Sequence, residues 1–274
     1  MKLITSIIAL FFCFSFVNAQ TYEDWVEKSF TFMENKEWSA AEECLLKALR
    51  LKPANPENAI LLSNLGTVQR EQGKIADALQ SYNTGLLFAE ESPTLLLNRA
   101  TLYLDIDSTN LALADLSAAI AIDHKNIDPY YVRGMIYLER ADTTGALNDF
   151  QEMLKINPNS SKARLGLAAV NTEMGAYSEA ERLYNIVITN NPKNPNIYLN
   201  RAELYFLWDK NNKALEDIRK ALNLDPENPI GYVLRGKIKM KQYEPKSAHA
   251  DFLKAKELGF DSPMLEEYLK QSKK

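Results

Sequence analysis

The sequence predicts an all-α fold made of repeated helix pairs, and three regularities support this prediction. An alanine returns every 34 residues, a large apolar side chain follows it by four residues, and a small residue precedes it by twelve. A fixed period of this length is typical of proteins whose units stack in a row. A spacing of four residues puts the alanine and the large side chain on one face of a helix, and the small residue lets a second helix cross that face closely.

The three positions recur seven times along the chain. The alanines at intervals of 34 are Ala78, Ala112, Ala146, Ala180, Ala214 and Ala248, and Ala41 precedes Ala78 by 37 residues. The large apolar residues are Leu45, Tyr82, Leu116, Phe150, Tyr184, Ile218 and Phe252. The small residues are Ser29, Gly66, Ala100, Gly134, Ala168, Ala202 and Gly236. In four repeats a proline follows the alanine by twelve residues and must end a helix there; these prolines are Pro53, Pro158, Pro192 and Pro226.

This arrangement closely resembles the tetratricopeptide repeat (TPR), for example where Gly66 and Gly73 precede Ala78 and Tyr82. The resemblance extends over residues 22–262. It implies seven repeats, each made of two antiparallel helices. The expected repeats are 22–55, 59–92, 93–126, 127–160, 161–194, 195–228 and 229–262.

Two local features qualify this division. The turn between the two helices is expected near Gly73 or Gly175, because glycine adopts the left-handed backbone conformation at little cost. Three extra residues, 56–58, separate the first two repeats, which leaves the stacking of the first repeat open.

After the seventh repeat the sequence predicts one further helix within 263–274. Ser262 offers an N-cap, Pro263 suits the first helical position, and Leu265 and Leu269 lie on one face. Such a face can cover the exposed end of the last repeat, as a stacked array requires. The resemblance implies that the repeats coil into a right-handed superhelix. The expected fold is therefore an all-α, right-handed superhelical solenoid of seven helix pairs plus a C-terminal capping helix.

Residues 1–19 are predicted to be a secretion signal. Lys2 supplies the positive start, the fifteen residues 3–17 form an apolar run, and Ala19 is the small residue after which signal peptidase cuts. We therefore expect an exported chain, periplasmic or secreted, that begins at Gln20. A retained membrane anchor is the alternative, although a span needs roughly 20 apolar residues. No membrane span is expected in the mature chain.

Composition argues against several classes of function. The chain has 32 Lys and Arg residues against 36 Asp and Glu residues and a formal charge of −4, which speaks against nucleic-acid binding. His124 and His249 have no Cys or His neighbours at ligand spacing, so no metal or other cofactor is expected. Cys44, the single cysteine after residue 19, is expected to be a small buried hydrophobe. No catalytic constellation is present, and an enzyme is not expected.

Four repeats share a charge pattern. They have an arginine just before the small residue and an aspartate just before the large one, whereas the other three repeats have neither. The arginines could form an anion-binding stripe, but their occurrence together with the aspartates favours structural ion pairs between the two helices. The predicted pairs are Arg99 with Asp115, Arg133 with Asp149, Arg201 with Asp217 and Arg235 with Asp251.

The resemblance implies that the first helix of each repeat lines a concave groove where partners bind. The residues expected to bind a partner there are mostly apolar: Phe30, Met33, Asn64, Leu97, Asn98, Leu104, Tyr131, Met135, Leu138, Leu199, Asn200 and Phe206. Among them, Asn64, Asn98 and Asn200 occupy one recurring place. Their amides could pair with the backbone of an extended peptide or bond neighbouring first helices, and both interpretations stay open.

These features favour a non-enzymatic scaffold for protein–protein interaction. It would hold a peptide or helical segment of a partner in its groove, in a bacterial cell-envelope assembly. The partner's identity does not follow from the sequence. The alternatives are a self-associating structural component and an accessory binder of an envelope ligand such as polysaccharide.

Overall fold

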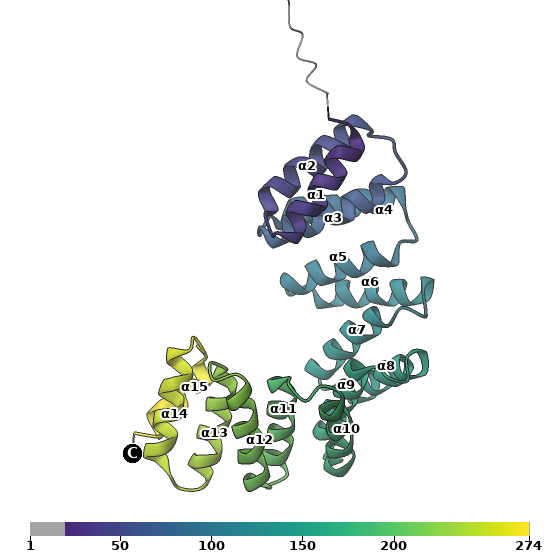
Figure 1. Cartoon of the computed structure of the whole chain (residues 1–274). Helices are drawn as coiled ribbons and strands as arrows, with labels where there is room; N and C mark the ends of the chain where they lie inside the picture. The colour runs from purple at the N-terminus through teal and green to yellow at the C-terminus, as the bar shows by residue number, and fades with distance from the viewer. Residues whose placement is uncertain (1–19, 274) are drawn as a thin grey trace, which may run out of the picture. The chain divides into compact units, whose positions relative to one another are not determined.

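The computed structural model describes residues 20–273, and these residues form fifteen α-helices and no strand (Figure 1). The predicted secretion signal lies outside the described residues. In chain order the helices are α1 (Tyr22–Glu34), α2 (Trp38–Leu51), α3 (Asn58–Glu71), α4 (Ile75–Phe88), α5 (Pro93–Asp105), α6 (Thr109–Ile122), α7 (Ile127–Glu139), α8 (Thr143–Ile156), α9 (Ser161–Glu173), α10 (Tyr177–Asn190), α11 (Pro195–Leu207), α12 (Asn211–Leu224), α13 (Pro229–Lys241), α14 (Pro245–Glu257) and α15 (Pro263–Gln271).

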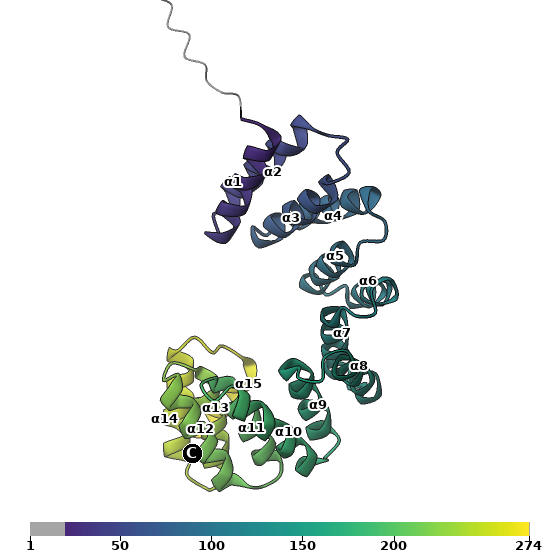
Figure 2. The same ribbon diagram turned by 45° about the vertical axis from the view of Figure 1, so that its right-hand side comes forward.

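The helices group into two compact blocks, each with its own internal packing. The first block ends at Ile122 and contains α1–α6, and the second begins at Asp123 and contains α7–α15. Within a block the helices form antiparallel pairs, from α1 with α2 to α13 with α14, and each pair packs on the next (Figures 1 and 2). The expected all-α array of seven helix pairs with a terminal helix is confirmed.

The small and large positions explain how closely the helices of a pair cross. The seven recurring alanines are fully buried. A Cβ atom added to Gly66 would lie 2.5 Å from the Tyr82 ring, and one added to Gly134 would lie 2.8 Å from the Phe150 ring. There is no room for a side chain at either place, so the small residue is a steric requirement of the pair.

The turns within the pairs share a left-handed residue. Gly73 and Gly175 have φ angles of 73° and 72°, as the sequence predicts. The other five turns adopt the same conformation without glycine, which the sequence does not reveal. The non-glycine residues, with φ between 55° and 61°, are Lys36, Asp107, Ala141, Asp209 and Tyr243. Backbone hydrogen bonds hold these turns, for example from Ala141 N to Leu138 O at 2.9 Å.

Asn58 closes the junction where three residues are inserted. Its side chain is buried and accepts a hydrogen bond from the Tyr22 hydroxyl at 3.1 Å. The same amide donates to the backbone carbonyls of Lys52 at 2.7 Å and Pro53 at 3.2 Å. One buried amide therefore joins α1, the α2–α3 loop and α3, and α3 packs against α2 despite the insertion.

The last helix covers the end of the seventh pair. The Ser262 hydroxyl accepts a hydrogen bond from the Leu265 backbone N–H at 3.1 Å and so caps α15. Leu265 and Leu269 are buried in a cluster with Phe252, whose ring stacks on Tyr268 at a centroid distance of 5.1 Å. α15 is thus the capping helix that the sequence predicts.

Candidate functional site

In the first block, the expected groove residues lie on the first helices of their pairs. Phe30 on α1 is exposed, and the others are half-buried: Met33, Asn64, Leu97, Asn98 and Leu104. Asn98 donates a hydrogen bond from its amide to the Ser63 hydroxyl at 2.9 Å. For this asparagine the structure therefore supports a bond between neighbouring first helices, from α5 to α3.

In the second block, α7 presents a mixed surface. Met135 is 37% exposed and Leu138 is half-buried. The Tyr131 ring lies 6.3 Å from the Phe150 ring, between centroids, and the Lys162 ammonium lies 5.5 Å from the Tyr131 centroid. Tyr131 therefore packs against its own repeat's large residue, so its side chain supports the fold as well as the surface.

Leu199 corrects the expectation of a groove-facing side chain. It is only 3% exposed and packs with Tyr198, Ala202 and Leu234 in the core. Its place on the first helix is as predicted, but the next pair covers it. It contributes only to the floor of the surface pocket described next.

An apolar pocket of about 240 Å³ lies where α11, α13 and the start of α15 meet. Its most exposed apolar side chains are Ile230, at 51%, and Met264, at 48%. The residues that line it are Leu199, Asn200, Glu203, Ile230, Val233, Leu234, Lys237, Phe260 and Met264. A concave apolar site with a few polar groups is the usual form of a ligand site.

Three polar side chains give the pocket its chemistry. Asn200 is exposed, and within the described part of the chain its amide forms no hydrogen bond. Glu203 and Lys237 add one charge of each sign. Lys237 and Lys241 each place an ammonium 5.4 Å from the centroid of the Phe206 ring, so this predicted groove residue lies under two cations.

Phe260 and Met264 are among the pocket residues that sequence reasoning missed. Phe260 precedes the capping helix and Met264 lies in its first turn, so neither residue belongs to the first helix of a repeat. The available signal was Phe260 itself, because an aromatic residue stands where the repeat pattern usually has proline.

The four predicted arginine–aspartate contacts are present. Arg133 donates from Nε and Nη2 to the two carboxylate oxygens of Asp149 at 2.9 and 2.7 Å, and the other three pairs have the same two-bond geometry. Their aspartates are buried. The hydrogen bond to Asp149 raises the pKa of Arg133, so this arginine stays charged. These arginines join the helices of a pair and are not an open anion-binding stripe.

Within residues 20–273, no group of three or more His, Cys, Asp or Glu side chains could hold a metal ion. In the same residues, no helix has the length and apolar character that crossing a bilayer demands.

The fold defines an α-helical repeat protein built from stacked helix pairs. Residues 31–95, 137–204 and 195–228 each match a sequence model of the tetratricopeptide repeat. A tetratricopeptide repeat protein from Parabacteroides merdae ATCC 43184 is 39% identical, and the match covers 93% of this chain and all of that one with a TM-score of 0.80. The chain belongs to the tetratricopeptide-repeat family.

Other proteins match parts of this chain. YrrB, described as a TPR protein with an unusual peptide-binding site, is 21% identical over 70% of this chain and 97% of its own, with a TM-score of 0.54. Human superkiller complex protein 3 is 30% identical over 148 residues, which are 54% of this chain and 9% of that protein. The chain thus spans only a small part of the first of its curated relatives.

Proposed function

We propose that this protein is a non-enzymatic scaffold that binds an apolar peptide or helical segment of a partner protein along its first helices. The pocket between α11, α13 and the start of α15 is the main contact in the second block. Its exposed Ile230 and Met264 are the observation that supports this proposal, because such side chains gain free energy when a partner covers them.

The polar groups of the pocket set what the partner segment presents. The Asn200 amide offers one donor and one acceptor to a peptide unit, whatever its side chain. Lys237 can pair with a carboxylate of the partner, and Glu203 with a cation. The partner segment that fits this pocket therefore presents an apolar side chain with polar backbone groups on either side of it.

The proposal is tested with 12-residue peptides selected on the full chain from a random displayed library. Changing Ile230→Ala together with Met264→Ala should weaken binding of the selected apolar peptides at least about tenfold, or about 1.4 kcal/mol. Both side chains are about half exposed, so circular dichroism should show an unchanged fold. Isothermal calorimetry of each variant measures the effect.

Matched controls lie on exposed surfaces of α8 and α10. Lys155→Ala and Arg182→Ala should leave the affinity unchanged. Added salt should weaken binding only slightly, because ions do not screen apolar burial. Peptide binding that falls steeply with salt and ignores Ile230 and Met264 would contradict the proposal.

We also propose that the protein works outside the cytoplasm, in a bacterial cell-envelope assembly. The support is the pattern of residues 1–19, with a positive start, an apolar run and Ala19 at the cleavage position.

A further inference from the structure

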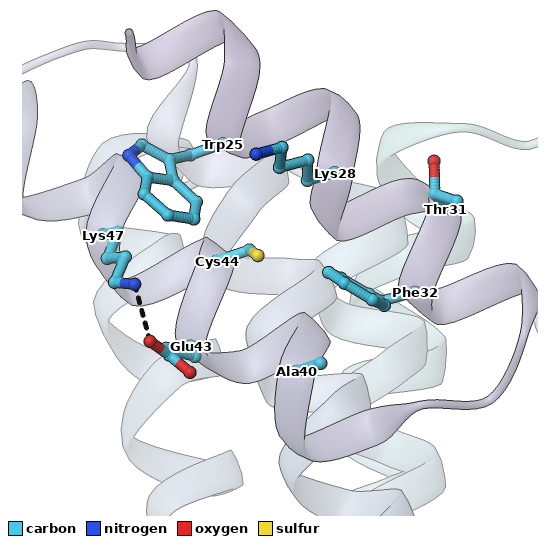
Figure 3. Close-up of a pocket in the computed structure, with 8 residues that line it drawn as sticks. All are labelled: Trp25, Lys28, Thr31, Phe32, Ala40, Glu43, Cys44 and Lys47. Carbon is cyan, nitrogen blue, oxygen red and sulfur yellow. Dashed lines mark ion pairs between the residues drawn. The ribbon is translucent and has the colours of Figure 1, made fainter. Parts of the chain in front are cut away.

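The first helix pair has an open pocket of about 360 Å³ on the flank that faces the start of the array (Figure 3). Trp25, Lys28 and Phe32 come from α1, and Cys44 and Lys47 come from α2. We call these five residues the N-terminal flank. Trp25 and Phe32 are half-buried and supply apolar walls, while Cys44 closes the floor.

Within the blocks, the matching surface of the first helix of a later pair is covered by the second helix of the preceding pair. In the first block, α4 packs on α5, and Asn83 accepts a hydrogen bond from Arg99 Nη1 at 2.7 Å. In the second block, α10 packs on α11, and Glu181 accepts from the Tyr205 hydroxyl at 2.7 Å. The fold thus shows which element fits this kind of surface, namely an α-helix.

The α1 side of the N-terminal flank resembles one receiving surface in particular, the surface of α11 that receives α10. Two aromatic residues and a cation recur at matching places of the two helices. The correspondences are Trp25 with Tyr198, Lys28 with Arg201 and Phe32 with Tyr205. The first pair therefore has the side chains of a helix-receiving surface, and no described helix lies on its pocket.

One substitution changes the charge of this surface. Arg201 is held by Asp217, whereas Lys28 has Cys44 at the corresponding place. Burial raises the pKa of the Cys44 thiol, which keeps it neutral. Within residues 20–273 no carboxylate lies in ion-pair distance of Lys28, and its ammonium lies 5.2 Å from the Trp25 ring centroid. Lys28 can therefore pair with a carboxylate from outside the chain.

We propose that the N-terminal flank binds an amphipathic α-helix of a partner protein, with apolar side chains on Trp25 and Phe32 and an acidic side chain facing Lys28. The acid takes the place that Asn185 of α10 occupies beside Arg201. A second copy of this chain offers no such helix at its C-terminal end, because α15 already covers α14. This inference does not depend on the pocket of the second block.

The test uses synthetic peptides of residues 177–190, the sequence of α10, held helical by a covalent link on the face away from Asn185. One peptide has Asn185→Asp and the other has Asn185→Lys. Fluorescence anisotropy with the full chain should show at least about tenfold tighter binding of the Asp peptide. On binding, the indole N–H resonance of Trp25 should shift, which locates the contact.

A charge swap makes the test specific. Lys28→Glu should weaken binding of the Asp peptide at least about tenfold and strengthen binding of the Lys peptide. Lys28→Gln should make the two peptides bind with equal affinity. Lys155→Glu, the same change on the exposed surface of α8, should alter neither. Equal binding of both peptides to the unmodified chain, no response to Lys28→Glu, or no saturable binding up to about 1 mM would overturn the proposal.

Discussion

Single residues decide how the two helices of a pair are joined, and the arginine–aspartate contacts show this most directly. Asp149 is 3% exposed, and it accepts two hydrogen bonds from a half-buried arginine of the facing helix. A buried carboxylate costs free energy unless it is paired, so each partner needs the other.

We expect Asp149→Ala to lower the free energy of unfolding by about 3 kcal/mol, because it leaves the Arg133 guanidinium half-buried without its carboxylate. Urea denaturation followed by circular dichroism measures the loss. Glu152→Ala, which removes the carboxylate of the exposed pair with Lys155, should cost less than about 1 kcal/mol.

A double-mutant cycle between Arg133 and Asp149 separates the interaction energy of this pair from the contributions of the surrounding residues. A coupling energy above about 1 kcal/mol is expected for a buried, two-bond contact. Coupling near zero would return Arg133 to the candidate ligand-binding residues.

Asn98 shows why part of the candidate site could not be read from the sequence. An asparagine amide can bond a peptide or a neighbouring helix, and its position in the repeat is the same in both cases. The choice depends on Ser63, a residue 35 positions earlier that only the stacked helices bring within 2.9 Å.

At the level of helices and turns, the period accounts for the array because the same small and large residues meet in every pair. The sequence predicts the conformation of the turns less well, since five of the seven turns adopt a left-handed φ angle at a residue other than glycine. Hydrogen bonds to the end of the first helix impose that angle whichever residue is present.

We expect Ala141→Gly to raise the free energy of unfolding by up to about 1 kcal/mol, because it relieves a φ of 57° that disfavours a residue with a Cβ atom. Thermal and urea denaturation measure the change. Ala118→Gly, an exposed position inside α6, is the matched control and should cost about 1 kcal/mol. A lower stability of Ala141→Gly would contradict this expectation and show that the left-handed φ of Ala141 is held by hydrogen bonds without backbone strain.

At the scale of the whole molecule, each of the two blocks is a stack of helix pairs with buried apolar clusters of its own. Only local neighbours pack on one another, so surfaces near the ends differ from those between pairs. The C-terminal end has α15, whereas the N-terminal flank has an open pocket.

For the complete chain we expect the natural host to produce a protein that begins at Gln20, because residues 1–19 have the charge and apolar pattern of a cleaved signal. Intact-mass measurement of the protein isolated from that host tests this. A mass that retains the first 19 residues, found in the membrane fraction, would instead support an anchor.

The sequence by itself determined the repeat period, the helix pairs, the capping helix and the four ion pairs. Each of these depends on contacts between residues at a fixed spacing, and such a spacing can be read directly from the sequence. Only the tertiary structure decided that Leu199 is buried, that Tyr131 packs on Phe150, and that Phe260 and Met264 form a pocket wall. The physical reason is that the exposure of a side chain depends on which neighbouring helix covers it, and that neighbour is set by how successive pairs stack.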